Sequence, residues 1–466
     1  ADKWPTHVDG KPSSQIQRMA QNSHCKTVQA DEAASVLCDL DTGEPFNIRR
    51  TVGDKGLLFH HRRHLADGQI LFLVNTSDSS VSSGTVESDM QGVWQWDLTV
   101  GYPNAYRFTK TSSGVRAEFS LQPCESLLLF LSNQPCRSKR DWPTETVRLA
   151  GRDPIHVKRT HPNVLTLDYV DITAGGETLE HVYVYQANQF AFKKNGLDRN
   201  PWDSAVQYKD ELITKTFSAD TGFSATYTFA IEKTVPDNLA IVIERPDLYT
   251  LICNGHPVQW DKESWWLDKA FGRINISALA KTGRNVVTIK ASPFTIYHEL
   301  ESAYVLGDFA LKNTSQGFVI TPDETLRVAP QGWNAQGHPF YSAGVAYTQI
   351  FDTPQRRGRY EISLPKWYGS TARVSVNGVL ADRLVARPWT CDVTSLIKPG
   401  QNTIQVEVIG TLKNTLGPHH GNPGLGTAWP SMFQRGPKSG PPAGDAYHTV
   451  AYGLFEPFVL TQIKAK

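Results

Sequence analysis

Two stretches of this sequence repeat one pattern, and that pattern decides the fold. The first copy reads LICNGHP (251–257), INISAL (274–279) and KTGRNVVTI (281–289), and the second reads VSVNGV (374–379), CDVTSL (391–396) and KPGQNTIQV (398–406). Each copy predicts a strand, an Asn-Gly reversal, a short turn, a Gly-x-Asn turn and another strand. Asn-Gly supplies the positive φ angles of a tight hairpin, and the later glycine does the same before the last strand. Two copies of one pattern indicate two tandem β-sandwiches of one type.

The segments around the repeat predict further short strands. Residues 57–63 and 70–75 alternate apolar and polar side chains on either side of Asp67-Gly68, which is typical of a hairpin. We therefore expect a mainly β protein with a small antiparallel domain followed by two jelly-roll, galactose-binding-like sandwiches. The expected division is an α/β stub over 1–52, the small β domain over 53–138, and sandwiches over 139–312 and 313–466. Helices are expected in the stub alone, near 16–21 and 31–37.

The composition excludes several classes of protein. The 466 residues carry 47 Lys and Arg against 46 Asp and Glu, so no overall field attracts a nucleic acid or an anionic membrane. The most hydrophobic stretch, 127–131, has the length of a buried strand rather than of a membrane span. The six cysteines form no CxxC pair, which disfavours a zinc ribbon. Cys25 with Cys38, and Cys124 with Cys136, are left open between disulfides and buried thiols.

The repeated pattern and several segments outside it carry a resemblance to known families. The order of an Asn-Gly turn, a D-x-T-x-L-like turn and a Gly-x-Asn turn resembles the sugar-binding jelly roll attached to family 2 glycoside hydrolases. Further segments resemble the region downstream of the barrel in large bacterial α-L-rhamnosidases of glycoside hydrolase family 106; they are 56–63, 70–75, 96–101, 121–130, 200–203, 304–309 and 416–420.

The resemblance implies a catalytic (β/α) barrel on the N-terminal side, with two glutamates as general acid and base. At most about 50 residues precede the first β domain here, whereas a barrel needs roughly 250. We therefore expect the barrel to lie outside this sequence, formerly in the same chain or in a partner. No glutamate here matches a catalytic residue of the family. The resemblance also implies a secreted or periplasmic bacterial protein.

Carboxylates near residue 300 are the candidates for chemistry within this chain. A glycoside hydrolase needs two carboxyl groups about 5 to 9 Å apart around one sugar. Glu299 and Glu301 share one face of an extended segment, and Asp308 follows closely in sequence. Such carboxylates would serve as a catalytic pair or, with backbone carbonyls, as ligands of a calcium ion. The alternative without a function is that these carboxylates are exposed surface charges.

Aromatic and histidine residues are the candidates for sugar binding. An indole face suits the C–H patch of a pyranose, while hydroxyl groups need fixed polar partners. The loop 332–341 supplies both kinds in Trp333, His338 and Tyr341, and is the first choice for a binding loop. The remaining candidates are Trp265, Trp266, Trp389, Trp429, His419 and His420. Of these, the two histidines open a long Gly/Pro-rich loop running to about Gly444, which we expect to cover a sugar or a neighbouring domain. Many of these aromatic rings are equally suited to a β core.

Three functions remain open at this stage. The leading one is the non-catalytic, carbohydrate-binding C-terminal region of a rhamnosidase-like glycoside hydrolase, with a polysaccharide or oligosaccharide as ligand and a catalytic barrel as partner. The second is a self-contained glycoside hydrolase that uses Glu299, Glu301 or Asp308. The third is a structural interaction module whose tryptophans all lie in cores.

Overall fold

The computed structural model describes residues 7–8, 11–15, 18, 45–98, 101–139, 144–203, 210–353 and 358–465. Antiparallel sheets dominate these residues, which confirms the mainly β prediction. Within them, no helix is long and apolar enough to cross a membrane. The helices expected near 16–21 and 31–37, and Cys25 with Cys38, lie mostly or wholly outside the described residues. The chain divides into two compact units, Ala1–Asp141 and Trp142–Lys466.

Unit 1 is a small two-sheet sandwich, preceded by a hairpin of β1 (His7–Val8) and β2 (Lys11–Pro12). One sheet has the order β3-β6-β10-β9 and the other the order β4-β5-β11-β7-β8. The strands are β3 (Phe46–Arg50), β4 (Leu58–Leu65), β5 (Gly68–Asn75), β6 (Ser82–Ser88), β7 (Gly92–Trp96), β8 (Pro103–Ala105), β9 (Thr109–Thr111), β10 (Gly114–Leu121) and β11 (Ser126–Ser132). Alternate residues of β5, β10 and β11 point into one apolar core. Cys124 and Cys136 are free thiols, so they form no disulfide.

Unit 2 holds two sandwiches, and the first comprises residues 163–321. One of its sheets has the order β14-β24-β18-β22-β21, and the other has the order β16-β15-β17-β23-β19-β20 with β25 and β26 attached. The strands are β14 (Asn163–Leu167), β15 (Tyr169–Ala174), β16 (Glu177–Tyr183), β17 (Phe223–Ile231), β18 (Ala240–Glu244), β19 (Thr250–Cys253), β20 (His256–Val258), β21 (Trp265–Trp266), β22 (Asp268–Asn275), β23 (Gly283–Ala291), β24 (Ala303–Gly307), β25 (Ala310–Asn313) and β26 (Phe318–Thr321).

The second sandwich of unit 2 is built from 144–159 and 344–465. Its sheets have the orders β12-β35-β28-β32 and β13-β27-β33-β30-β31, beside a small pair, β29 and β34. The strands are β12 (Thr144–Leu149), β13 (Gly151–Arg159), β27 (Gly344–Thr353), β28 (Arg359–Ser363), β29 (Trp367–Tyr368), β30 (Thr371–Val376), β31 (Val379–Leu384), β32 (Thr390–Asp392), β33 (Gly400–Ile409), β34 (Gly453–Leu454) and β35 (Val459–Ala465).

The two sandwiches are nested rather than strictly tandem. β12 and β13, which fall in the range expected for the first sandwich, pair with β35 and β27 of the second. The first sandwich is therefore an insertion between β13 and β27. The partners of β12 and β13 lie about 200 to 300 residues away in the chain, beyond the reach of a local pattern.

The repeat forms the same hydrogen-bond network in both sandwiches. Asn254 and Asn377, the first residues of the two Asn-Gly turns, have φ angles of 47° and 52°. Each donates from its side-chain amide to the side-chain oxygen of a buried asparagine, Asn285 in the first copy and Asn402 in the second, at 2.9 Å in both. Each buried asparagine also donates to two carbonyls of its own Gly-x-Asn turn. The repeat is thus a fold-determining feature.

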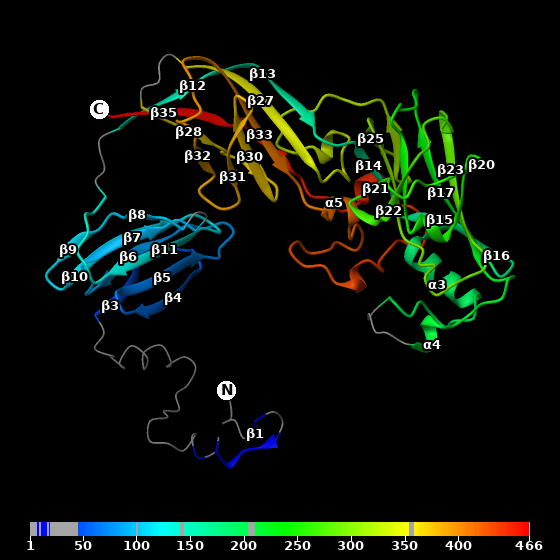
Figure 1. Ribbon diagram of the computed structural model, residues 1–466, viewed down its shortest axis with the longest axis horizontal. Coiled ribbons are helices and arrows are strands. Elements are labelled where there is room, and N and C mark those ends of the chain that lie inside the picture. Colours follow the sequence, from blue (N-terminus) through cyan, green and yellow to red (C-terminus); the bar gives the residue numbers. More distant parts are fainter. Residues whose placement is uncertain are drawn as a thin grey trace. The chain divides into compact units, whose positions relative to one another are not determined.

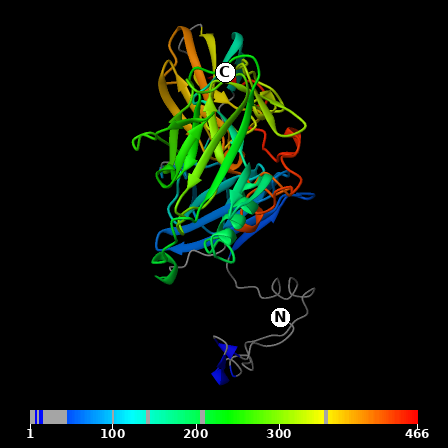
Figure 2. The same cartoon turned by 90° about the vertical axis from the view of Figure 1, so that its right-hand side faces the viewer.

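Helices and one long loop complete unit 2 (Figure 1), so the expectation of helices in the stub alone is wrong. The helices are α3 (Val184–Lys194), α4 (Asp210–Ile213), α5 (Lys413–Leu416), η1 (Pro246–Leu248), η2 (Asn334–Gln336), η3 (Pro430–Met432) and η4 (Gly444–Ala446). The burial of Val184, Ala187, Ala191 and Phe192 shows that α3 packs one face on the first sandwich. Figures 1 and 2 both show α3 at one end of the strands of that sandwich.

The long loop, residues 417–448, belongs to the second sandwich in sequence but binds the first; we call it the strap. Tyr169 and Tyr183 of the first sandwich donate hydrogen bonds to the carbonyls of Pro437 and Phe433 in the strap, at 3.1 and 2.8 Å. The strap therefore covers a neighbouring sandwich, one of the two roles expected for it.

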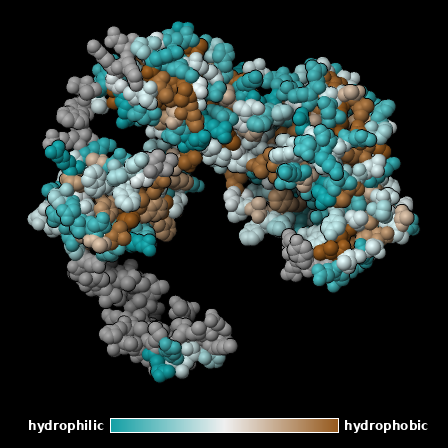
Figure 3. All heavy atoms as spheres, in the orientation of Figure 1, coloured by the Kyte–Doolittle hydropathy of each residue, from teal (hydrophilic) through white to brown (hydrophobic). Residues whose placement is uncertain are grey.

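The surface seen in Figure 3 carries mostly hydrophilic residues with smaller hydrophobic patches.

Candidate functional site

A cavity of about 400 Å³ lies in unit 2 between one end of the first sandwich, α3 and the strap; we call it the strap pocket. Neighbouring strands of the sheet are antiparallel, so the end of β14, the start of β24 and the end of β18 meet at the same edge. This arrangement brings Asp168, Glu301 and Glu244 to the cavity from separate parts of the chain. Phe271, which pairs with Glu244 across the sheet, closes one side.

The segment 299–301 is the part of the pocket whose backbone is held most firmly. Tyr249 and Tyr227 donate from their hydroxyls to the carbonyls of its first and last residues, at 2.9 and 2.5 Å. The side-chain oxygen of Asn188 on α3 accepts the N–H of Leu300 at 3.1 Å. The two glutamates therefore extend from a fixed backbone, which lowers the cost of ordering them around a ligand.

Three glutamates give the pocket an unusual electrostatic character. Glu301 is exposed toward the cavity, yet protein atoms crowd around it, and this desolvation, together with Glu244 and Glu299, raises its pKa to about 8. Burial also raises the pKa of Glu299, with Asp203 adding to the effect, and that of Glu244, with Glu299 adding to it. At neutral pH the group with the higher pKa, Glu301, holds a proton and can donate a hydrogen bond, whereas ionised carboxylates accept them.

Two aromatic residues of the pocket, Tyr185 and Trp202, come from α3 and the loop after it. Trp202 donates from its indole nitrogen to the carbonyl of Ile296 at 2.9 Å, which fixes the ring at the cavity. Asn200 donates to Glu299 at 2.6 Å and so links this loop to the acidic segment. Tyr185 donates to one oxygen of Asp203 at 3.4 Å. The other Asp203 oxygen is buried and has no hydrogen-bond partner among the described residues, so it is available to a ligand donor.

The strap supplies the third wall and is anchored by a buried carboxylate. Asp168 accepts hydrogen bonds from His420 at 2.8 Å and from Tyr447 at 2.9 Å, and all three side chains are buried. Burial raises the pKa of Tyr447, and Asp168 adds to the effect, so the phenol stays a donor. Because His420 and Tyr447 lie near the two ends of the strap, this contact holds the segment between them against the first sandwich.

His419 is the histidine of the pair that lines the pocket. Its Nε2 lies 2.9 Å from the carbonyl of Asn414, and burial lowers its pKa to about 4. The imidazole is therefore neutral at physiological pH, with Nε2–H donating to the carbonyl. The neighbouring His420 points to Asp168, so the two adjacent rings serve different contacts.

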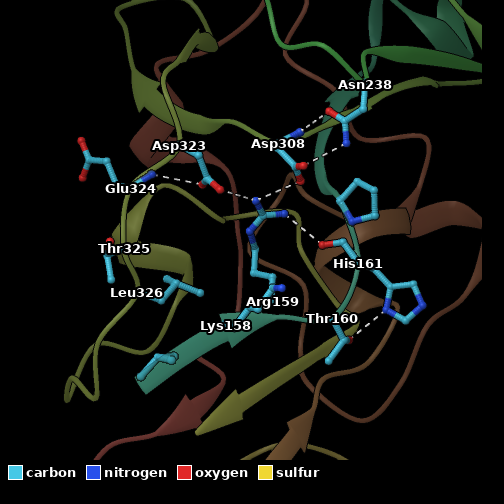
Figure 4. A pocket seen from close by; sticks show the side chains of 12 residues that line it. Lys158, Arg159, Thr160, His161, Asn238, Asp308, Asp323, Glu324, Thr325 and Leu326 are labelled. Carbon is cyan, nitrogen blue, oxygen red and sulfur yellow. Dashed lines mark hydrogen bonds and ion pairs between the residues drawn. The ribbon is translucent and has the colours of Figure 1, made fainter. Parts of the chain in front are cut away.

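A second cavity, of about 520 Å³, lies where the two sandwiches meet (Figure 4). Arg159 at the end of β13 donates to Asp323 at 2.6 Å and lies 3.5 Å from Asp308, which accepts from Asn238 at 3.0 Å. Burial pushes the pKa of Asp323 upward, but contacts with His338 and Arg159 outweigh it and lower that pKa to about 2. These charged groups satisfy one another, so we interpret the cavity as an ion-paired junction between sandwiches.

The structure separates the carboxylates that the sequence grouped together. Glu299 and Glu301 line the strap pocket, whereas Asp308 lines the junction cavity and pairs with Arg159. Asp308 follows β24 and Glu301 precedes it, so the strand carries them to opposite ends of the sheet. Asp308 therefore cannot act together with the two glutamates.

The loop expected to bind sugar is instead part of the core of the second sandwich. Trp333, His338 and Tyr341 are each at most 1 % exposed. Trp333 donates from its indole nitrogen to the carbonyl of Tyr341 at 3.0 Å, and its ring packs on Tyr452. The prediction that these side chains stack on a sugar is wrong for this conformation, because no ring face reaches the surface. Trp333 Nε1 and His338 Nδ1 lie within hydrogen-bond distance of carbonyls of the same loop and so help to hold its turn.

The other aromatic candidates fall into three groups. Trp266 and Trp389 are half-buried, and their rings contact Tyr304 and Trp367. Trp265 is 46 % exposed on β21 but does not line the strap pocket. Trp429 is 67 % exposed and directly precedes Pro430, which does line it. Of the predicted binding residues, therefore, His419 is in the pocket and Trp429 is at its edge.

Several pocket residues escaped the sequence analysis: Tyr185, Asn188, Asp203, Glu244 and Phe271. Glu244 had a readable signal, since it is the first charged residue after the apolar run 239–243 and so marks a strand end. The others become neighbours only through the packing of α3 and β22, which no local spacing records.

The pocket does not provide a recognisable metal centre. Among the described residues, no group of three or more His, Cys, Asp or Glu side chains is arranged to hold a metal ion. Glu244, Glu299 and Glu301 line one cavity, but they do not form such a group.

Comparisons with known proteins place glycoside hydrolases among the structural neighbours. The chain matches no protein-family model and no curated protein. It is similar to the rhamnosidase from Novosphingobium sp. PP1Y, with 13 % identity and a TM-score of 0.41 over 97 % of this chain and 28 % of that one. It is also similar to the α-L-rhamnosidase of Streptomyces avermitilis, solved with L-rhamnose, with 12 % identity and a TM-score of 0.25 over 90 % and 39 %. It is also similar to the β-D-mannosidase of Dictyoglomus thermophilum, with 10 % identity and a TM-score of 0.22 over 53 % of this chain and 31 % of that one. The chain spans at most 39 % of the length of these three proteins.

Proposed function

We propose that this chain binds carbohydrate in the strap pocket, as the non-catalytic β region of a rhamnosidase-like glycoside hydrolase. The observation that carries the proposal is the pocket itself, which Glu299, Glu301 and Asp203 line together with Tyr185 and Trp202. A sugar presents C–H bonds that pack on aromatic rings and hydroxyl groups that need fixed polar partners. The pocket offers both, on a backbone that is already ordered.

The proposal also accounts for the polarity of the pocket. The carboxyl group of Glu299 and the unpartnered oxygen of Asp203 can accept hydrogen bonds from hydroxyl groups, while a protonated Glu301 donates one. A neutral sugar hydroxyl can both donate and accept, so it matches this mixture. Under this proposal the partner is a catalytic barrel, in the same chain or in another, and the protein acts in the periplasm or outside the cell.

Calorimetric titration with L-rhamnose and rhamnose-containing oligosaccharides tests the binding. We expect Glu299→Gln to weaken the affinity about tenfold, which corresponds to roughly 1.4 kcal/mol, because it replaces a charged acceptor. The matched control is Glu263→Gln, an exposed glutamate outside the pocket, which should leave the affinity unchanged. Equal effects of both variants would show that the sugar does not bind at Glu299, and no heat with any sugar would favour a purely structural module.

A second candidate function, glycoside hydrolysis by this chain alone, is favoured by one observation. Glu301, with a pKa near 8, lines the same cavity as Glu299 and Glu244, and pairs of carboxyls with separated pKa values serve as acid and base in glycosidases. Release of reducing sugar from a polysaccharide panel tests it. Hydrolysis that falls more than about 100-fold in Glu301→Gln, with binding retained, would support this function over the first.

A further inference from the structure

We propose that the ligand of the strap pocket is an oligosaccharide of at least two sugar units, with the second unit stacked on Trp429 at the pocket rim. This inference rests on the proposed function, since it assumes that the first unit occupies the pocket. It adds the size of the ligand and the position of a second subsite. The argument starts from the exposure of one indole and from its place in the chain.

Trp429 is the most exposed tryptophan among the described residues, with 67 % of its surface open. Large aromatic rings bury most of their surface in folded proteins, so an open indole next to a pocket indicates a binding surface. Phe433, which is 39 % exposed, lines the pocket a few residues later. The two rings flank the turn whose first residue, Pro430, also lines the pocket.

The rim is exposed but anchored. The turn η3 closes through hydrogen bonds from Met432 N–H to the Trp429 carbonyl at 2.9 Å and from Phe433 N–H to the Pro430 carbonyl at 3.1 Å. Tyr183, itself a pocket residue, donates to the Phe433 carbonyl at 2.8 Å and ties the turn to the first sandwich. A ligand therefore meets a prepared platform rather than a loop that it must first order.

The position of the indole fits a second unit better than the first. Trp429 itself does not line the cavity, but its Cα is one peptide unit, about 3.8 Å, from that of Pro430, which does. Under this proposal, a sugar held among the glutamates extends its glycosidic bond toward the turn that starts at Pro430, and the second unit meets Trp429. Because the rim offers an uncharged ring, it recognises the C–H face of a neutral pyranose.

Titration of the full chain with L-rhamnose and with its disaccharide and trisaccharide tests the proposal, for wild type, Trp429→Ala and Trp265→Ala. Trp265 is the matched control because it is also an exposed tryptophan, on β21, and does not line the pocket. We expect wild type and Trp265→Ala to bind the disaccharide about tenfold more tightly than the monosaccharide. In Trp429→Ala this gain is expected to disappear, while the affinity for the monosaccharide stays.

The outcomes separate this inference from the proposed function. Equal affinity for all three sugars, or a length dependence that survives in Trp429→Ala, overturns the second subsite and leaves the pocket standing. Absence of binding to any of them in wild type overturns both. Quenching of Trp429 fluorescence by the disaccharide alone, scored against Trp429→Ala, gives an independent readout of stacking.

Discussion

The two sandwiches of unit 2 share one strand order and differ at one end. The sheet β14-β24-β18-β22 of the first corresponds strand for strand to β12-β35-β28-β32 of the second. In the first, β18 ends at Glu244 and the segment before β24 carries Glu299 and Glu301. In the second, β28 is followed by the buried Leu364, and Trp367 packs on Trp389 at 5.0 Å. The shared core therefore sets the scaffold, and the segments at the strand ends set the chemistry.

Because of the strap, the pocket of the first sandwich depends on both sandwiches. It belongs to the second sandwich by chain connection and to the first by contact, and it supplies Pro418, His419, Pro430 and Phe433 to the pocket. The first sandwich alone lacks that wall. The following four predictions are ordered from the largest effect to the smallest. They test whether the repeat stabilises both sandwiches equally while only the first sandwich carries a binding site.

Removal of the carboxylate that anchors the strap should have the largest effect. Asp168→Ala leaves His420 and Tyr447 buried without their acceptor, so we expect a loss of about 4 kcal/mol in the free energy of unfolding. Urea denaturation measures it, and loss of sugar binding should accompany it because the strap forms one wall of the pocket. Asp237→Ala, at an exposed aspartate, should cost less than about 0.5 kcal/mol. Similar values for both variants would remove the anchoring role of Asp168.

The buried asparagines of the repeat provide a direct test of equivalence. Asn285→Ala and Asn402→Ala each remove a buried side-chain amide and its hydrogen bonds to the turn backbone, so each should cost about 2 to 3 kcal/mol. In each variant, amide hydrogen exchange should show that protection is lost mainly in the sandwich that carries the substitution. A large cost at one position and almost none at the other would show that the repeat does not play the same role in both copies.

The raised pKa of Glu301 predicts that the stability of the protein depends on pH through a group in the first sandwich. The folded state binds this proton more tightly than the unfolded chain, whose carboxyl has its ordinary value of 4.5, so the stabilisation is complete below that pH. It is lost as the pH rises through about 8. Glu301→Gln should therefore be more stable than wild type at pH 9 and similar to it near pH 4. The expected difference at pH 9 is only about 1 kcal/mol, because water in the cavity screens the charge.

Thermal unfolding at several pH values measures this difference. Glu263→Gln is the control, and its stability relative to wild type should stay constant over the same range. A constant difference for Glu301→Gln as well would show that Glu301 titrates as an ordinary surface carboxyl.

The ion pairs at the junction should contribute the least. Arg159→Met removes the contacts with Asp323 and Asp308, which are exposed, so we expect a cost of about 0.5 to 1 kcal/mol in low salt. The difference from wild type should shrink in 1 M NaCl because salt screens exposed charges. A loss that is large and independent of salt would instead indicate a packing role for the Arg159 side chain, which is only 8 % exposed.

Much of the fold could be predicted from local sequence, whereas most of the site could not. The turns at Asn254 and Asn377 were predictable because they depend on φ angles that few residues adopt. Glu299 and Glu301 were predicted as a pair because they are two residues apart on an extended segment. Trp333 was assigned to a sugar surface and lies in a core, because an aromatic ring among polar residues fits either environment until its neighbours are known.

The sequence by itself determined the β class, the two related sandwiches and the candidacy of Glu299, Glu301, His419 and Trp429, since these depend on periodicity, turn residues and side-chain chemistry. The tertiary structure alone decided that β12 and β13 join the second sandwich, that Asp308 lies away from the glutamates, and that the strap completes the pocket. Each of these depends on contacts between residues far apart in the chain. Hydrogen bonds such as that from Tyr447 to Asp168 form only when the whole unit is folded.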